Sequence, residues 1–238
     1  MSSVINDDCL NSDLGLRKLN EEGAKVMLKI STYPLGPIQT NCYVIQDEEN
    51  NCIVIDPGEE GTRIITEIEN MGLSPLAILL THGHFDHIGA VDTVRDRFKI
   101  PVYIHENESK SLTDPVENGS TRYPGLPLVK NRKADHLIMD EGYMNIGPFT
   151  FEVRHTPGHS TGSISFIFQE DKIAIAGDTL FKEGIGRTDL PGGDMKTLLE
   201  SIHNKLLTLG EGFTIYPGHG GPTTPQDEMD SNPYLNGF

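Results

Sequence analysis

One segment guides the interpretation of the whole chain: Ala77-Ile78-Leu79-Leu80-Thr81-His82-Gly83-His84-Phe85-Asp86-His87. An apolar run typical of a buried strand leads directly into a hexapeptide with three histidines and one aspartate. Side chains on one short loop at a strand end can converge on a point, and imidazole with carboxylate suits Zn, Fe or Mn. Because the chain has only 9 histidines, this clustering argues against a loop that is His-rich by accident. The segment therefore predicts a metal site.

Length and composition are those of a globular protein. The 238 residues suggest one large domain or two small ones, and 36% of them are hydrophobic and 23% charged. No apolar run approaches the ~20 residues that a membrane span needs. The acidic N-terminus has neither the apolar core of a secretory signal nor the arginines of a transit peptide. We therefore expect a cytoplasmic protein with no membrane partner.

The chain is strongly acidic. Its 35 Asp and Glu residues against 19 Lys and Arg residues give a formal net charge of −16 at pH 7. Such a field repels nucleic acid and anionic membranes, so we expect neither as a partner. Cys9, Cys42 and Cys52 lack paired spacing, which is typical of reduced thiols, and we predict none of them as a metal ligand.

Hydrophobic periodicity predicts alternating groups of strands and helices. Residues 1–25 are polar without a clear period, and we expect an extension there, with at most a helical turn over 14–19. Residues 26–238 are predicted to form a single domain. Strands are predicted over 26–32, 41–46, 52–56, 76–80, 101–104, 143–146, 149–154, 163–168, 172–176 and 213–216. Helices are predicted over 61–71, 88–98 and 194–209, the last capped by Asp194, with a long loop over 113–135 and an irregular C-terminal tail.

The order of these elements predicts an α/β or α+β fold. Each half of the chain begins with strands and continues with strand–helix units, and the helices can cover the outer faces of the sheets. This repetition suggests a four-layer αββα sandwich built from two similar halves.

Three further candidate ligands follow apolar strands in the same way as the hexapeptide. His159, Asp178 and His219 each stand just past a predicted strand and beside a glycine that lets the backbone turn. Strand ends at one edge of a sheet can meet in space. Together with the hexapeptide they supply seven candidate donors: His82, His84, Asp86, His87, His159, Asp178 and His219. Seven donors are too many for one tetrahedral ion and about right for two ions that share a carboxylate.

This donor pattern resembles the metallo-β-lactamase superfamily. The sequence His-x-His-x-Asp-His over 82–87, followed at increasing distances by His, Asp and His, is highly specific, and the resemblance extends over 26–233. It implies the αββα sandwich and two metal ions. It also implies the ligands of each ion: His82, His84 and His159 for the first, Asp86, His87 and His219 for the second, with Asp178 and a water or hydroxide bridging the pair.

Other segments point to one branch of the superfamily. Residues 177–181, 186–194 and 216–224 resemble the small glyoxalase II-like (hydroxyacylglutathione hydrolase-like) enzymes. Several true β-lactamases carry cysteine at the position of Asp178, which argues against that activity. Full-length glyoxalase II enzymes have a C-terminal helical domain that helps to bind glutathione. Because this chain ends shortly after His219, we expect that domain to be absent.

The resemblance implies a metal-dependent hydrolase that cleaves thioesters, with S-(2-hydroxyacyl)glutathiones such as S-lactoylglutathione as the substrate class. A metal-bound hydroxide at a dinuclear site would attack the thioester, with Asp86 and Asp178 as the catalytic carboxylates. Zinc is the first expectation for the two divalent ions, and iron or manganese also suits these ligands. We expect a monomer or a homodimer.

Two alternatives remain open. Persulfide dioxygenases share the hexapeptide and the Gly-Arg-Thr-Asp sequence of 186–189, and in them the positions of His82, His159 and Asp178 hold a single iron that acts on glutathione persulfide. They commonly have Pro-Ala-His-Asp where this chain has Pro-Gly-His-Gly over 217–220, which favours the hydrolase. The other alternative is a metal-binding protein that has lost catalysis, and the complete donor set argues against it.

Polar residues near the predicted centre each have two interpretations. Thr81 and Asp56 could orient a ligand imidazole, or Asp56 could cap the following helix. Arg187 could pair with Asp189 or contact a substrate carboxylate. The basic run 130–133 either forms a solvated face or attracts an anionic thioester. The candidate substrate contacts are therefore Arg187, Lys130, Arg132 and Tyr123, with Arg122 at the same opening.

Overall fold

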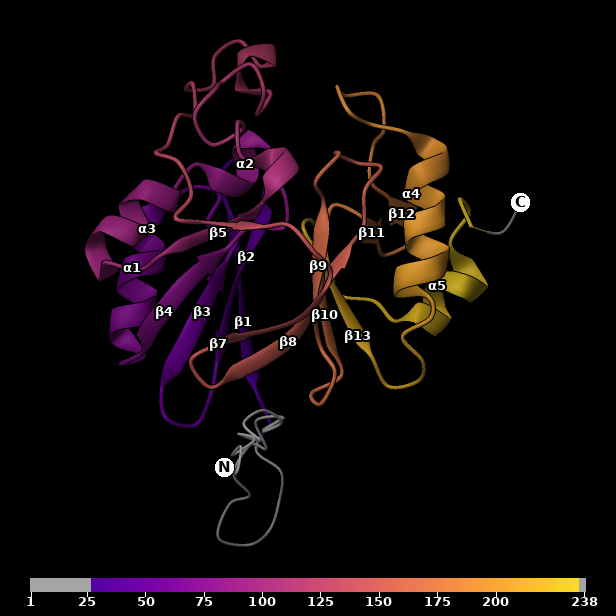
Figure 1. The fold of residues 1–238 in the computed structure, drawn as a ribbon, viewed down its shortest axis with the longest axis horizontal. Helices are drawn as coiled ribbons and strands as arrows, with labels where there is room; N and C mark the ends of the chain where they lie inside the picture. Colours follow the sequence, from indigo (N-terminus) through magenta and orange to yellow (C-terminus); the bar gives the residue numbers. More distant parts are fainter. Residues whose placement is uncertain (1–26, 236–238) are drawn as a thin grey trace, which may run out of the picture.

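Two β-sheets face each other at the centre of the molecule, with helices on their outer sides (Figure 1). The structure, a computed structural model, describes residues 27–235. The extension predicted for residues 1–25, with its helical turn, therefore lies outside the described residues. Within the described part, no helix is long and apolar enough to cross a membrane.

The first sheet comes from the N-terminal half of the chain. Its six strands stand in the order β1 (Lys29–Leu35), β2 (Thr40–Gln46), β3 (Asn51–Ile55), β4 (Ser74–Leu79), β5 (Val102–His105) and β6 (His136–Ile138). The first three form an antiparallel meander, and β3 to β6 are parallel neighbours. Parallel neighbours need crossover connections, which α1 (Gly61–Asn70) and α3 (Val91–Phe98) supply.

The second sheet comes from the C-terminal half. Its five strands stand in the order β13 (Thr214–Pro217), β10 (Ile173–Gly177), β9 (Ile164–Phe168), β8 (Phe149–His155) and β7 (Gly142–Ile146). β7 to β10 are antiparallel neighbours, and β13 joins β10 in parallel. The crossover to β13 passes through the small hairpin β11 (Leu180–Phe181) and β12 (Gly184–Ile185), then α4 (Met195–Ser201) and a π-helical turn (Ile202–Leu206). α5 (Pro225–Ser231) follows β13.

Alternating side chains of the strands build separate apolar layers. In β3, Cys52 and Val54 pack toward α1 and α3, whereas Ile53 and Ile55 face the other sheet, because successive side chains of a strand point to opposite faces. A third apolar layer lies between the second sheet and α4. Three apolar layers thus separate four layers of secondary structure, and the predicted αββα sandwich is confirmed.

The strands that precede the predicted donors all end at one edge of the sandwich. β8, β10 and β13 point in one direction, since β9 is antiparallel to both β8 and β10, and β13 is parallel to β10. β4 of the first sheet reaches the same edge, where Ile164 donates its backbone N–H to the carbonyl of Thr81 at 2.9 Å. The loops after these four strands therefore meet at this edge, near α2 (Phe85–Ile88) (Figure 1).

Two elements of the first half differ from their predictions. The first strand lies over 29–35 rather than 26–32. The helix predicted over 88–98 is wrong at its start, because α2 ends at Ile88 and α3 begins at Val91. The break occurs where the backbone N–H of Ala90 donates to the carbonyl of Pro57 at 2.9 Å, which ties this segment to the turn after β3.

The C-terminal helices also differ from expectation. Asp194 caps α4 as predicted, its carboxylate accepting the N–H of Thr197 at 2.8 Å, but the α-helix gives way to a π-helical turn after Ser201. The tail is not wholly irregular, because Thr224 caps α5 and Pro225 stands in its first turn. The predicted loop over 113–135 contains turns and one short 3-10 helix, η2 (Ser120–Arg122), and β6 directly after it was not predicted.

Candidate metal centre

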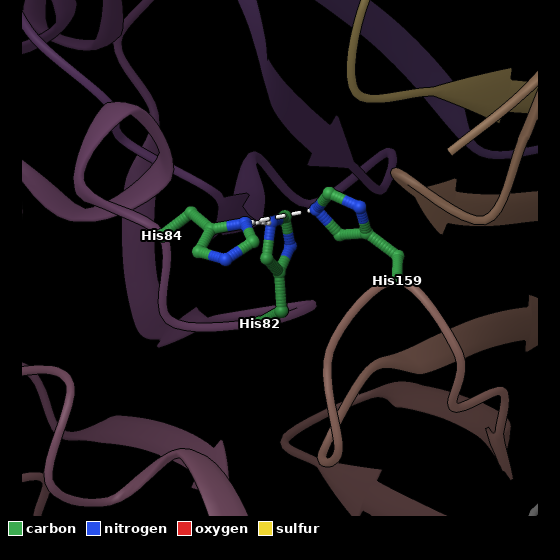
Figure 2. A group of neighbouring side chains, drawn as sticks. All are labelled: His82, His84 and His159. Carbon is green, nitrogen blue, oxygen red and sulfur yellow. Dashed lines mark hydrogen bonds between the residues drawn. The ribbon is translucent and has the colours of Figure 1, made fainter. Parts of the chain in front are cut away.

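Three histidines from two loops form the first half of the centre. His82 and His84 follow β4, and His159 follows β8. Nδ1 of His84 lies 2.8 Å from Nε2 of His159 and 3.1 Å from Nε2 of His82, and the three rings converge on one point (Figure 2). We call these residues the histidine trio. His82 and His159 are buried and His84 is half-buried.

A group that includes a carboxylate forms the second half. Asp86 and His87, on α2, and His219, after β13, bring ligand atoms within 4.8 Å of one another, and we call them the mixed trio. Asp178 stands between the two groups. Its Oδ2 lies 3.6 Å from Nε2 of His159 and 3.5 Å from Nε2 of His219, and its Oδ1 lies 3.3 Å from Nε2 of His87. All seven predicted donors are thus brought together, and Asp178 faces both trios.

Buried polar atoms of the centre fit divalent metal ions. Nε2 of His87 and Oδ1 of Asp178 are buried and make no hydrogen bond within the part of the chain that the structure describes. The two atoms face each other at 3.3 Å, and a cation bound by both would satisfy them. Imidazole and carboxylate are ligands for divalent zinc, iron and manganese. The donor chemistry and the unpaired atoms therefore both match a metal centre.

Hydrogen bonds on the outer side of two rings fix which nitrogen faces the centre. His87 donates its Nδ1 proton to Oδ2 of Asp56 at 3.0 Å. His159 donates its Nδ1 proton to the backbone carbonyl of Arg187 at 2.8 Å. Nε2 of each ring therefore faces the other donors, which is how outer hydrogen bonds orient a ligating imidazole.

Asp56 anchors the first of these arrangements. Its Oδ1 accepts the backbone N–H of Thr81 at 2.8 Å, and its Oδ2 accepts the Thr81 hydroxyl at 2.6 Å. Because that hydroxyl proton is engaged, Oγ1 of Thr81 accepts the Nδ1 proton of His82 at 3.1 Å. The other interpretation of Asp56, as the cap of the following helix, is wrong, since the residue at the N-cap of α1 is Glu60.

The histidines of the two trios differ in charge. Burial, followed by the charge of a neighbouring imidazole, lowers the pKa of His84 to about 3, and the same causes hold the pKa of His82 well below its usual value. These rings are neutral at pH 7, as metal ligation requires. Burial alone would lower the pKa of His219 as well, but hydrogen bonds to Asp178 and Asp86 outweigh it and raise that pKa to about 9. In the metal-free protein, a proton therefore occupies the mixed trio.

Asp86 is held in its charged form by several neighbours. Burial alone would raise its pKa, but the nearby charge of His87 and the hydrogen bond from His219 outweigh burial and lower the pKa to about 2. The hydroxyl of Thr40, which no motif marked, donates to Oδ2 of Asp86 at 2.8 Å and contributes in the same direction. The carboxylate is therefore available as a ligand throughout the neutral pH range.

Gly218 allows the loop of His219 to approach the other donors. A Cβ atom at this position would lie 2.0 Å from Oδ1 of Asp178 and 2.8 Å from the ring of His87. The loop is fixed there by backbone hydrogen bonds, because Gly218 donates to the carbonyl of Gly177 at 2.7 Å. A larger side chain would separate His219 from Asp178.

A cavity of about 140 Å³ opens over the donors. Arg187 and Tyr123, predicted as substrate contacts, line its wall together with Arg122. Arg187 also forms the predicted ion pair with Asp189, through two contacts of 2.7 Å, and reaches the Tyr123 hydroxyl at 3.4 Å. Apolar side chains that were not predicted as substrate contacts also line the wall: Ile38, Phe85, Val116, Leu190 and Pro191.

Lys130 and Arg132, also predicted as substrate contacts, do not line this cavity. Arg132 pairs with Asp96 at 2.5 Å and with Asp92 at 3.4 Å, both on α3. Lys130 lines a separate groove beside the start of α1. The basic run is held on another face by acidic residues of α3, in agreement with the alternative of a solvated face.

The fold and the site together define an αββα sandwich that carries a centre for divalent metal ions at one edge. The chain belongs to the metallo-β-lactamase superfamily, whose family model matches residues 35–219. The matched range contains all seven donors.

Two curated relatives match nearly over their whole length. "Probable metallo-hydrolase YqgX" of Bacillus subtilis (strain 168) is 51% identical over 211 residues, covering 89% of this chain and 99% of the relative. "Hydroxyacylglutathione hydrolase GloC" of Haemophilus influenzae is 41% identical over 210 residues, covering 88% of this chain and 99% of the relative. Both similarities support a metal-dependent hydrolase.

Solved structures with the same fold carry different names. BLEG-1 B3 metallo-beta-lactamase has a TM-score of 0.86 and 52% identity, covering 88% of this chain and 100% of that one. TTHA1623 in a di-iron-bound form has a TM-score of 0.78 and 37% identity, covering 86% and 100%. ETHE1 from Myxococcus xanthus has a TM-score of 0.69 and 27% identity, covering 88% and 85%. Because one fold serves several activities, the reaction has to be argued from the site.

Proposed function

We propose that this protein is a metal-dependent thioester hydrolase whose substrates are S-(2-hydroxyacyl)glutathiones such as S-lactoylglutathione. The observation that carries the proposal is the position of Asp178 between the histidine trio and the mixed trio, which suits two ions sharing a carboxylate. The 41% identity to GloC of Haemophilus influenzae, named as a hydroxyacylglutathione hydrolase, supports the substrate class.

The side chains of the centre have separate tasks in this proposal. The histidine trio would hold one ion and the mixed trio the other, with zinc as the first expectation. When bound, such ions lower the pKa of water to about 7 and polarise a carbonyl group. Asp86, held by Thr40, would orient the attacking water through its carboxylate oxygen. Asp56 and Thr81 would keep the rings of His87 and His82 in the ligating orientation.

The cavity wall fits a thioester that carries negative charge. Ile38, Phe85 and Leu190 offer apolar surface to the carbon atoms of the substrate. Arg122 and Arg187 offer guanidinium groups, which suit a carboxylate. In a chain of formal charge −16, a cationic group at the opening would offset part of the repulsion of an anionic substrate. Arg122 is the main such group, because Asp189 balances the charge of Arg187.

Thioester hydrolysis is tested with protein purified without added metal. Its metal content is measured first, and thiol release from S-D-lactoylglutathione is then followed with a thiol reagent. We expect two metal equivalents and steady thiol release in the wild type, and loss of both in Asp178→Ala. Lys130→Gln, a change outside the cavity, serves as the matched control. An intact thioester after incubation with fully loaded wild-type protein would contradict the proposal.

Two other reactions are distinguished with the same preparation. The 52% identity to a protein named as a B3 metallo-beta-lactamase favours β-lactam hydrolysis as the second candidate, which nitrocefin turnover measures. The persulfide dioxygenase alternative rests on Gly-Arg-Thr-Asp over 186–189, and it requires a single iron and oxygen consumption with glutathione persulfide. We expect kcat/KM to be highest for the thioester.

A further inference from the structure

Glu108 is a buried carboxylate that joins both loops of the histidine trio, although it is not one of the seven donors. It is 4% exposed and ends the short 3-10 helix η1 (Glu106–Glu108) after β5. Its Oε2 accepts the backbone N–H of Gly83 at 3.1 Å, and its Oε1 accepts the backbone N–H of Gly162 at 2.8 Å. Gly83 separates His82 from His84, and Gly162 stands three residues after His159 in the chain. One side chain therefore spans the gap between the two segments that supply the trio.

Both glycines, Gly83 and Gly162, lie close against residues 105–111, which include η1. A Cβ atom at Gly83 would lie 2.4 Å from Cβ of Ser111 and 2.9 Å from Oε2 of Glu108. A Cβ atom at Gly162 would lie 2.7 Å from Cγ of Glu108 and 2.9 Å from Nδ1 of His105. Neither position has room for a Cβ atom on the side of η1, so glycine allows this close approach, and the two hydrogen bonds oppose movement of the loops away from η1.

Further contacts tie η1 to the His159 side. The rings of His105 and His155 stack with centroids 4.5 Å apart and an interplanar angle of 7°. His155 donates its Nε2 proton to the carbonyl of Thr161 at 3.0 Å, and the amide of Asn107 donates to the same carbonyl at 3.4 Å. On the other side, the hydroxyl of Ser111 makes only a long contact of 3.5 Å with Oε2 of Glu108. The two backbone bonds of Glu108 thus link the loops directly, beside the hydrogen bond from Ile164 to the carbonyl of Thr81.

We propose that Glu108 is a positioning residue that sets the metal affinity of the histidine trio. It holds His82 and His84 on one loop and His159 on the other at the separation in which their nitrogens converge. The proposal deepens the proposed function and rests on it only for the presence of metal at the centre. Metal affinity is its readout, so an absence of thioester hydrolysis would leave it intact.

The chemistry of the side chain explains why glutamate is needed here. An ionised carboxylate is an acceptor at both oxygens, whereas a glutamine amide has one oxygen and one NH₂ group. In Glu108→Gln, one of the two backbone N–H groups must face an NH₂ donor. A buried N–H left without an acceptor is unfavourable, so one loop will shift away. The mixed trio lacks this link. Glu108 binds two backbone N–H groups and one hydroxyl, and none of these groups belongs to Asp86, His87 or His219.

The test is a competition between loaded protein and a chromophoric zinc chelator. Wild type should release its two zinc ions in two steps, which His84→Ala and His219→Ala assign to the histidine trio and to the mixed trio. We expect Glu108→Gln to lower the zinc affinity of the histidine trio about 10- to 100-fold, the usual effect of losing a group that orients ligands. The zinc affinity of the mixed trio should stay within about twofold of wild type. Glu106→Gln, an exposed carboxylate on the same short helix, should match wild type.

Gly162→Ala provides an independent variant that keeps the carboxylate. Its added methyl group pushes on Cγ of Glu108, so the zinc affinity of the histidine trio should again fall. Ser111→Ala removes only the long contact and should have little effect. If Glu108→Gln releases both ions as wild type does, or weakens both steps equally alongside a lower Tm, the positioning role is overturned.

Discussion

Oδ2 of Asp56 accepts the Nδ1 proton of His87 at 3.0 Å, and both side chains are almost fully enclosed. The same carboxylate binds the backbone N–H and the hydroxyl of Thr81. Asp56 has a backbone φ of 50°, a left-handed conformation that costs a residue other than glycine about 1 kcal/mol or more. Its contacts offset that cost, and they link β3 to the loop that carries the hexapeptide.

Asp56→Asn tests this link. The amide must direct its NH₂ group either at Thr81 or at the Nδ1 proton of His87, so one existing hydrogen bond is replaced by two opposed donors. We expect metal affinity at the mixed trio to fall about 10- to 100-fold, measured by chelator competition. Asp140→Asn, an exposed aspartate, is the matched control. Wild-type affinity in Asp56→Asn would show that His87 is oriented by other contacts.

The position of Asp178 predicts how metal loss depends on the residue removed. Because Asp178 faces both trios, Asp178→Ala should lose both ions together. His219 is a member of the mixed trio and pairs with Asp86 and Asp178, so His219→Ala should lose mainly one ion. Metal content after extensive dialysis, measured by elemental analysis, distinguishes the two variants. Equal retention of metal in both would rule out the bridge.

The raised pKa of His219 predicts a pH dependence of metal binding. In the metal-free protein this pKa is about 9, compared with 6.5 for an unperturbed histidine, so below pH 9 a metal ion must displace a proton. Loss of the His219 proton alone should therefore raise affinity at the mixed trio up to about tenfold per pH unit as the pH approaches 9. Burial would lower the pKa of His87, but the charges of Asp178 and Asp86 outweigh it and hold that pKa well above its usual value, so a second displaced proton makes the slope steeper. The histidine trio, in which the pKa of His84 is about 3, should change little across neutral pH. Stepwise zinc titrations at several pH values measure both slopes.

The same pKa fixes the sign of a stability effect. A histidine whose folded pKa is raised contributes stability that is fully present below its unfolded pKa and is lost as the pH rises through its folded pKa. For His219, that window lies between pH 6.5 and about 9. Metal-free protein should thus lose this contribution with rising pH, while loaded protein, in which the proton has been displaced, should not. Urea unfolding of both forms at pH 6.5 and pH 9 tests the difference.

The donors could be predicted from the sequence because each stands directly after an apolar strand. Strand ends that share an edge bring such residues together whatever the details of the loops, as for His159 and His219. The continuous apolar run Cys52-Ile53-Val54-Ile55 likewise indicates a strand buried on both faces. The order of these elements alone predicts an α/β or α+β fold, and the four-layer sandwich is what the resemblance to the metallo-β-lactamase superfamily implies.

Other features depend on contacts that no local pattern reveals. Glu108 acts on backbone N–H groups, which have no signature in the sequence. The surroundings of the basic run are another such feature, because only the fold shows Arg132 paired with the acidic residues of α3. The helix α5 is different, since Thr224 followed by Pro225 is a recognisable start signal that was outweighed by the prolines of the tail.

Arg122 allows the direct contribution of charge at the cavity to be separated from the field of the whole protein. It is exposed and lines the cavity, whereas Lys130 and Arg132 lie on another face. An exposed charge pair contributes about 0.2–1 kcal/mol, so Arg122→Gln should raise KM for S-lactoylglutathione at most about fivefold and leave kcat nearly unchanged. The effect should shrink as salt is added, because exposed charges are screened. Lys130→Gln and Arg132→Gln change the net charge by the same amount and should leave KM unaltered. If all three variants raise KM equally, substrate attraction arises from the overall field, and Arg122 makes no direct contact.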